Sequence, residues 1–233
     1  MSAAAGPPLQ DFAAERARMA SEVEAMVRAT RGETGVGALS PAVRAALERV
    51  ERHRLVPASE VHRAYRNHPL PIGSGQTISQ PYIVALSTEL LAPQPGHVVL
   101  DVGTGSGYQA AMLAEVVARV HSIEILPELA HSARTALADL GYANVEVRVG
   151  DGYLGWPEAA PFDGIVVAAA APQVPAALVA QLKPGGRLVV PVGPTGGIQF
   201  LMLVTRRADG GADVRRVLPV RFVPLVPGPS SGG

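Results

Sequence analysis

One segment, Val98-Val-Leu-Asp-Val-Gly-Thr-Gly-Ser-Gly-Tyr108, sets the architecture expected of this chain. An apolar, β-branched run enters a turn with three glycines, and helix-forming residues follow. Glycine allows positive φ angles and a close approach of the backbone to a ligand, so the pattern is typical of a nucleotide-type site between a strand and a helix. A tight turn without a ligand has the same spacing, so this segment alone does not establish a site.

Strand and helix patterns alternate downstream of this turn. Strands are predicted over residues 97–102, 120–124, 145–149, 164–168 and 187–192, and helices over 108–118, 127–140 and 175–182. Strands joined by helices form βαβ units with right-handed crossovers, which predicts a mostly parallel α/β sheet. Residues 198–205 and 214–226 are apolar and β-branched, which predicts antiparallel edge strands at the C-terminal end.

The segment upstream of the turn is helical at first. Residues 9–29 have apolar side chains at helical spacing, and Ser40-Pro41 is typical of a helix start. Residues 55–80 show no clear period, and a long irregular segment inside a domain is usually functional or disordered. We therefore divide the chain into an N-terminal helical extension (1–35), one domain (36–226) and a flexible tail (227–233).

The composition excludes several classes of function. The absence of cysteine rules out disulfides, thiolate zinc sites and a cysteine nucleophile, and the six histidines have no metal-ligand spacing, so no metal is expected. The charge is balanced, with 20 basic and 20 acidic residues, which argues against a nucleic-acid partner. Neither a signal segment nor an apolar run long enough to span a bilayer is evident, so we expect a cytoplasmic monomer without membrane contact.

Acidic residues follow three neighbouring strands. Asp101 lies inside the first strand, next to its last residue, Glu124 closes the second, and Gly150-Asp151-Gly152 follows the third. The third glycine of the turn comes one residue too early for a dinucleotide fingerprint, and an acid in the strand suits a cationic or hydroxyl-bearing ligand. Glu124 has the separation expected of a carboxylate on ribose hydroxyls, and Asp151 could accept from the amine of an adenine.

Each acidic residue also has an ordinary structural alternative. Asp101 could hold neighbouring loop amides together, Glu124 could be a solvated charge at a strand end, and Asp151 could belong to a plain Asp-Gly turn. The convergence of three loops at one edge of the sheet favours a shared ligand, S-adenosylmethionine. Two rivals are a nicotinamide-binding oxidoreductase, disfavoured by the glycine spacing, and a catalytically silent cofactor-binding protein.

Further motifs resemble the protein-L-isoaspartate O-methyltransferase family. They are Pro69-Leu-Pro-Ile-Gly-Ser-Gly-Gln-Thr-Ile-Ser-Gln-Pro-Tyr82, Leu100–Gln109, Val149–Tyr153, Leu182–Arg187 and Arg221–Leu225. The resemblance covers roughly residues 40–226, with departures at Ser74, where the family often has histidine, and at Asn67, where it often has aspartate. It implies a Rossmann-like class I methyltransferase sheet with rearranged terminal strands.

The resemblance also implies the reaction and its residues. The family moves the methyl of S-adenosylmethionine to the α-carboxylate of L-isoaspartyl residues in damaged proteins and peptides, leaving S-adenosylhomocysteine; a relative acting on another carboxylate is the alternative. Ser79 matches the active-site serine and Thr77 a companion hydroxyl. The residues expected to bind the cofactor are Gln76, Ile78, Asp101, Gly103, Thr104, Gly105, Ser106, Glu124, Ile125, Asp151 and Gly152.

The expected chemistry is one of positioning. A substrate carboxylate has a pKa near ~3.5–4 and is already ionised at neutral pH, so no general base is needed. We expect Ser79 and Thr77 to hold one carboxylate oxygen in line with the methyl, since alignment can supply roughly 7–11 kcal/mol at best. Alternatively, Ser79 caps the helix that begins near Pro81.

Overall fold

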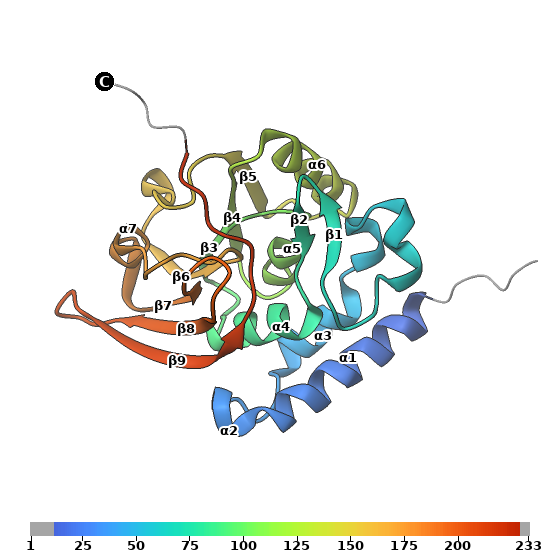
Figure 1. The fold of residues 1–233 in the computed structure, drawn as a ribbon, viewed down its shortest axis with the longest axis horizontal. Helices are drawn as coiled ribbons and strands as arrows, with labels where there is room; N and C mark the ends of the chain where they lie inside the picture. Colours follow the sequence, from blue (N-terminus) through green and yellow to red (C-terminus); the bar gives the residue numbers. More distant parts are fainter. Residues whose placement is uncertain (1–11, 229–233) are drawn as a thin grey trace, which may run out of the picture.

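A seven-stranded sheet of order β5-β4-β3-β6-β7-β8-β9 organises the structure, a computed structural model that describes residues 12–228 (Figure 1). Strands β3 to β7 are parallel, and β8 and β9 run antiparallel at one edge. The strands are β3 (Val98–Val102), β4 (Arg119–Glu124), β5 (Val145–Val149), β6 (Phe162–Val167), β7 (Leu182–Val192), β8 (Gln199–Arg206) and β9 (Ala212–Val220). The parallel α/β sheet with antiparallel edge strands is therefore confirmed.

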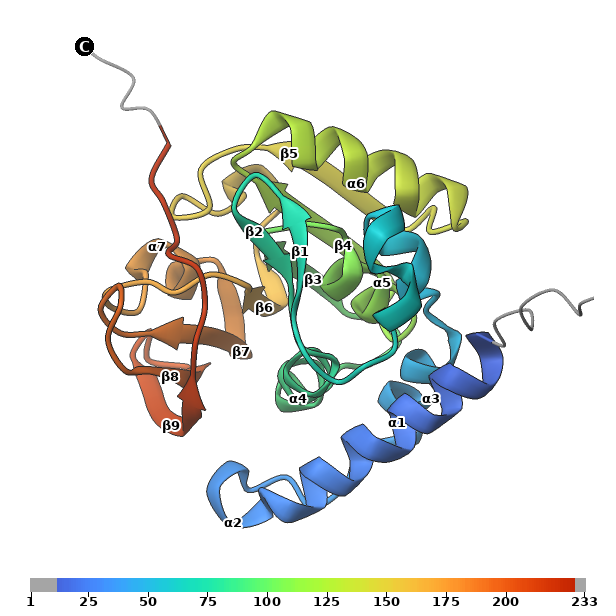
Figure 2. The same cartoon turned by 45° about the vertical axis from the view of Figure 1, so that its right-hand side comes forward.

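The helices cover both faces of this sheet, and a separate hairpin stands near α5 (Figures 1 and 2). The α-helices are α1 (Phe12–Ala29), α2 (Arg31–Thr34), α3 (Pro41–Arg49), α4 (Pro81–Leu90), α5 (Tyr108–Ala114), α6 (Pro127–Asp139) and α7 (Ala176–Ala180). The 3-10 helices are η1 (Arg52–Leu55), η2 (Ala58–Arg63) and η3 (Pro157–Ala159), and the hairpin consists of β1 (Leu70–Gly73) and β2 (Gln76–Ile78).

Strand β3 separates two apolar cores because its side chains alternate between the sheet faces. Val99 is buried in the larger core, which α1, α3, α4 and α5 cover, whereas Leu100 and Val102 are buried in the smaller core with residues of β6 and β7. Burial on both faces explains the continuous apolar run of the sequence. The order of the strands reverses direction at β3, where open α/β sheets bind ligands beyond the carboxyl ends of their strands.

Helix α1 belongs to the same core as the domain. Its buried residues Met19, Ala20, Val23 and Val27 pack in the larger cluster, and α1 contacts both α3 and α4. The predicted start of this helix at Leu9 lies outside the described residues, and the division at residue 35 stays a prediction. Helix α3 begins as expected: Pro41 is its first residue, and Ser40 Oγ accepts from Val43 N at 3.4 Å.

Strand β7 begins at Leu182 rather than at residue 187, so Leu182 belongs to it and not to the predicted 175–182 helix. Three other segments differ from the sequence prediction. Residues 70–78 are not irregular but form the β1–β2 hairpin, whose turn needs left-handed backbone at Gly73, Ser74 and Gly75 (φ 92°, 49° and 70°). Helix α5 ends at Ala114 rather than Ala118, because the N–H groups of Val116 and Val117 both bond Leu113 O in a tightened last turn.

The third difference lies at the C-terminal end, where β9 stops at Val220 instead of continuing to Val226. The buried side chain of Gln199 pairs with the backbone of Phe222, accepting from its N–H at 2.6 Å and donating to its carbonyl at 3.2 Å. These side-chain bonds replace the backbone ladder between β8 and β9, which ends at Val220. Residues 221–228 then cross the carboxyl end of the sheet. We call this segment the strap.

None of the helices among residues 12–228 is long and apolar enough to cross a membrane.

Candidate functional site

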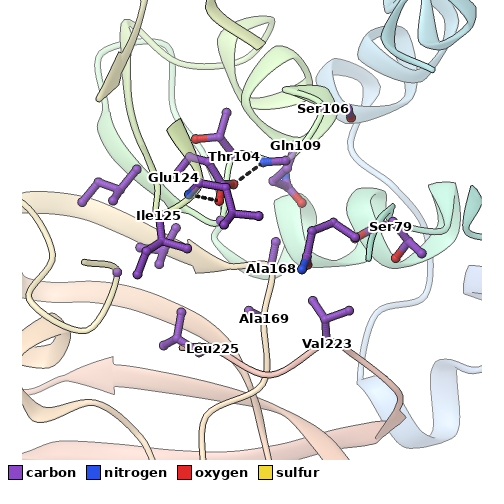
Figure 3. Close-up of a pocket in the computed structure, with 18 of the residues that line it drawn as sticks. Ser79, Thr104, Ser106, Gln109, Glu124, Ile125, Ala168, Ala169, Val223 and Leu225 are labelled. Carbon is purple, nitrogen blue, oxygen red and sulfur yellow. Dashed lines mark hydrogen bonds between the residues drawn. The ribbon is translucent and has the colours of Figure 1, made fainter. Parts of the chain in front are cut away.

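A cavity opens at the carboxyl ends of β3, β4 and β6, at the reversal of the strand order. Figure 3 shows Glu124 and Ile125 on one side of it, Ser79 on the other, and Val223 and Leu225 of the strap below. Eleven of the predicted site residues line it: Gln76, Thr77, Ile78, Ser79, Gly103, Thr104, Gly105, Ser106, Glu124, Ile125 and Gly152. Asp101 and Asp151 do not.

The glycine turn is fastened to the neighbouring strand. The N–H groups of Gly103 and Thr104 both donate to Ile123 O, at 2.8 and 3.1 Å. Gly103 and Gly107 have φ angles of 91° and 88°, which residues other than glycine rarely adopt. A Cβ at Gly107 would lie 3.1 Å from the Leu137 side chain. The turn therefore requires glycine for its conformation and for the close packing of α6.

Glu124 is buried at the cavity edge with both oxygens already engaged. Its Oε2 accepts from Gly105 N at 2.8 Å, and its Oε1 accepts from Leu126 N at 3.0 Å. Only 6% of the residue is exposed, so it is not the solvated strand-end charge of the alternative interpretation. A carboxylate has about four acceptor positions, which leaves each oxygen free to accept once more. Two adjacent acceptors match the two hydroxyls of a ribose.

Asp101 lies one layer behind the cavity wall. Its Oδ2 accepts from Ser122 Oγ at 2.8 Å, Ser122 Oγ lies 2.6 Å from Thr104 Oγ1, and Thr104 lines the cavity. The carboxyl is fully buried, and its Oδ1 has no hydrogen-bond partner among residues 12–228. Burial raises the pKa of Asp101 to about 7, and the negative charge of Glu124 acts in the same direction. A direct contact between Asp101 and a cofactor stays a prediction.

Asp151 holds two segments together at the cavity rim. Its Oδ1 accepts from Tyr153 N and its Oδ2 accepts from Gly228 N in the strap, each at 2.8 Å. These bonds belong to the turn interpretation, and the contact with adenine stays a prediction. The neighbouring Gly152 does line the cavity, where a Cβ would lie 2.6 Å from Val102 Cγ1 and 3.1 Å from Leu225 Cδ1. Only glycine leaves the space open there.

Thr77 and Ser79 stand where this cavity meets a second one. The second cavity, which we call the groove, shares Thr77, Ser79, Ala168 and Val223 with the first. Its remaining wall consists of Met26, Pro69, Gln80, Tyr82, Ile83, Gly196, Gly197, Ile198, Leu218, Pro219, Val220, Arg221 and Phe222. A ligand in the cavity and a chain in the groove can therefore meet at the two hydroxyls.

Ser79 does not cap the helix that follows it. Helix α4 has Gln80 at its N-cap position, and no side chain makes a capping hydrogen bond there. The capping interpretation of Ser79 is therefore wrong.

The strap is the part of the wall that sequence reasoning missed. Its Leu225 N donates to Ala170 O, and Ala170 N donates to Val223 O, both at 2.8 Å, so the strap is hydrogen-bonded to the loop that follows β6. Pro224 was the available signal, because proline cannot donate to the ladder of a regular strand. Other missed wall residues are Val84, Val102, Tyr108, Gln109, Ile123, Leu126, Ala168, Ala169, Pro224 and Val226.

Comparison with known proteins shows which family this chain resembles. A model of the family described as protein-L-isoaspartate(D-aspartate) O-methyltransferase matches residues 21–230. Protein-L-isoaspartate O-methyltransferase 2 of Polaromonas sp. is 56% identical over 207 residues, covering 89% of this chain and 98% of its own. The protein of the same name from Syntrophobacter fumaroxidans is 54% identical over 225 residues, covering 97% and 91%.

Solved structures share the fold. One named protein-L-isoaspartate O-methyltransferase superposes with a TM-score of 0.76 at 28% identity, covering 94% of this chain; the match spans 66% of that chain's length. A second, from Plasmodium falciparum, was solved in complex with S-adenosyl-L-homocysteine and has a TM-score of 0.73 at 24% identity, covering 91% of this chain and 98% of its own.

Proposed function

The chain belongs to the protein-L-isoaspartate(D-aspartate) O-methyltransferase family, and from this membership we propose the role of each residue of the site. The protein is an S-adenosylmethionine-dependent methyltransferase that esterifies the α-carboxylate of L-isoaspartyl residues in proteins and peptides, with S-adenosylhomocysteine as the other product. A carboxylate oxygen forms the new bond to the methyl carbon while the carbon–sulfur bond breaks.

The cavity fits the cofactor. Glu124 presents two buried carboxylate oxygens, each with a free acceptor position, to the ribose hydroxyls. The backbone of Gly103–Ser106 holds the amino-acid end, and Ile125 with Gly152 lies at the adenine end. The cofactor supplies a methyl that is activated by a sulfonium charge. The residues of the cavity bind and orient it, and the apolar strap residue Leu225 keeps water from that side.

Thr77 and Ser79 position the substrate. None of the described residues hydrogen-bonds the Ser79 hydroxyl, so it is free to donate to a carboxylate oxygen. Thr77 is exposed beside it and can donate to the same group. Because the carboxylate is already an anion, strong hydrogen bonds would stabilise its ground state and slow its attack. Two neutral hydroxyls fix its direction without that cost.

One observation carries the proposal: Thr77 and Ser79 line both the cavity and the groove. A methyl donor and a peptide acceptor can thus reach one place from opposite sides. The family match disfavours a nicotinamide-binding oxidoreductase. A relative that methylates another carboxylate would use the same junction, so the substrate must be tested directly.

The test uses two peptides that differ only at one residue, L-isoaspartate in one and normal L-aspartate in the other. With radiolabelled S-adenosylmethionine, we expect label in the isoaspartyl peptide at least 100-fold faster than in its twin, as a base-labile methyl ester. Equal labelling of both peptides would exclude isoaspartyl repair, and labelling of neither would favour a silent cofactor-binding protein. S-adenosylhomocysteine should bind in either case, whereas NADH should not.

We further propose that the enzyme acts as a cytoplasmic monomer without nucleic-acid or membrane partners. The balance of 20 basic and 20 acidic residues supports the absence of nucleic-acid and anionic membrane partners, since it provides no net field for polyanions. Light scattering of the purified protein, with and without added RNA, tests the state in solution. Cell fractionation tests the location.

A further inference from the structure

Arg52 is a fully buried cation without an acidic partner. Its exposure is 0%, it forms no salt bridge among the described residues, and it lies at the start of η1. Burial lowers the pKa of the guanidinium, which nevertheless stays protonated at physiological pH. Burying an unpaired charge is costly, so the position calls for a specific role.

The guanidinium donates to three backbone carbonyls from separate parts of the chain. Nη1 bonds Ala64 O, and Nη2 bonds His68 O at 3.2 Å and Ser79 O at 3.1 Å. His68 lies two residues before the first residue of the β1–β2 hairpin, and Ser79 directly follows its last residue. Arg52 therefore bridges the two ends of the hairpin at its base, next to the pairing of Leu70 with Ile78.

The hairpin needs such support. It is a sheet of two short strands, and an isolated two-stranded hairpin is at best marginally stable in water. Yet Gln76, Thr77 and Ile78 on β2, with Ser79 after it, form one side of the cavity. The face of Tyr108 lies 5.3 Å from the guanidinium carbon, and Tyr108 also lines the cavity. Arg52 thus connects the hairpin base to the helix that follows the glycine turn.

We propose that Arg52 is a positioning residue that acts through the backbone of Ser79, setting the place of the Ser79 and Thr77 hydroxyls relative to the cofactor. Arginine suits this task because its planar fork donates to several carbonyls at fixed angles, which lysine cannot reproduce. The kinetic consequence rests on the function proposed above. The structural consequence, a hairpin held by Arg52, does not.

The test compares wild type with Arg52→Lys, and with Arg54→Lys as the control. Arg54 is on the same 3-10 helix, but its exposed side chain pairs only with Glu51 on the surface. For Arg52→Lys we expect kcat for an isoaspartyl peptide to fall about 10- to 100-fold, since a misplacement of 1 Å can cost that much. The Kd of S-adenosylhomocysteine should rise by a smaller factor than kcat falls, because the hairpin forms only one side of the cavity. Arg54→Lys should match wild type in both.

A double-mutant cycle with Ser79→Ala separates positioning from general damage. If Arg52 acts through Ser79, Arg52→Lys should lower kcat less than about threefold in the Ser79→Ala background. An equal loss in both backgrounds, or a wild-type kcat in Arg52→Lys, would overturn the proposal. Arg52→Gln is made in parallel, because it buries no charge and folds where a buried lysine does not. The same pattern is expected for it.

Hydrogen exchange gives a readout independent of activity. In the presence of saturating S-adenosylhomocysteine, the amides of residues 70–79 should exchange faster in both Arg52 variants than in wild type, while those of β3 stay unchanged. Unchanged exchange of the hairpin amides in folded variants would refute the proposal that Arg52 holds the hairpin. A wild-type enzyme that labels no isoaspartyl peptide would instead refute the function and leave the exchange result standing.

Discussion

Glu124 is oriented before any ligand binds, because backbone amides on either side already donate to its two oxygens. The amides of Gly105 and Leu126 belong to the loops after β3 and β4. The carboxylate therefore links both loops and presents its remaining acceptor positions to the cavity. A site fixed in this way loses little conformational entropy on binding.

Glu124→Gln should weaken cofactor binding. The amide turns an N–H group toward one of the two backbone donors and removes one acceptor for the ribose. We expect the Kd of S-adenosylhomocysteine to rise roughly 10- to 100-fold, about 1.4–2.7 kcal/mol, measured by calorimetry. The exposed Glu146, paired with Arg119, provides the control Glu146→Gln, which should bind as wild type does. Wild-type affinity in Glu124→Gln would contradict the assigned role.

Asp101 should make the apo protein less stable as the pH rises. Burial raises its pKa from 3.8 to about 7, so between these values the folded state holds a proton that the unfolded state has lost. The stability contributed by the protonated form is present below about pH 4 and is lost as the pH rises through about 7. Asp101→Asn cannot titrate. The Tm of wild type minus that of Asp101→Asn should therefore decrease from pH 5 to pH 8; a constant difference would contradict the shift.

The strap and the hairpin are the two elements that close the cavity over the sheet. Both lack the long repeating pattern of a helix or a core strand, and both depend on side chains from other elements, Gln199 and Asp151 for the strap and Arg52 for the hairpin. The space between the strap and β3 is set by Gly152.

Gly152→Ala should displace the strap. The new methyl would lie 2.6 Å from Val102 Cγ1 on buried β3, which cannot move easily, and 3.1 Å from Leu225. Such overpacking costs about 1–3 kcal/mol, so we expect the Tm to fall by several degrees and the affinity for S-adenosylhomocysteine to drop. Gly96→Ala is the control, because nothing lies within 4 Å of its Cβ and its φ is not left-handed. Equal Tm values for both variants would contradict this packing.

The elements that sequence predicts well here are those with a regular repeat or a strong end signal. Buried strands such as Val98–Val102 are continuous apolar runs, and the helix predicted over 127–140 ends before Gly141, whose left-handed φ of 83° is typical of a helix end. The strap and the hairpin depend on contacts with distant parts of the chain. Apart from Pro224, which argues against a regular strand, no local pattern predicts these contacts. Asp101 shares the parity of Val99, so its side chain is on the side of the larger core and behind the cavity wall, and its contact with a ligand stays a prediction.

At the scale of the molecule, a neutral protein presents a groove with one charge. Arg221 is the only charged residue among the described residues that line the groove, and it is exposed. Because opposite charges attract weakly at a surface, by ~0.2–1 kcal/mol, we expect a modest preference for acidic neighbours of the isoaspartyl residue.

Peptides with glutamate or lysine beside the isoaspartyl residue test this preference. For wild type we expect kcat/KM to be about two- to fivefold higher with glutamate, a difference that shrinks in Arg221→Gln and at high salt. A preference for lysine, or one that survives Arg221→Gln, would show that another group reads the charge.

The central claim is that one cavity binds the cofactor and meets the peptide groove at Thr77 and Ser79. A crystal structure of the protein with S-adenosylhomocysteine tests it most directly. We predict the ribose hydroxyls on the Glu124 carboxylate and the sulfur directed toward the Ser79 hydroxyl. A ribose bound away from Glu124, or a sulfur facing β5 instead of the groove, would contradict the account.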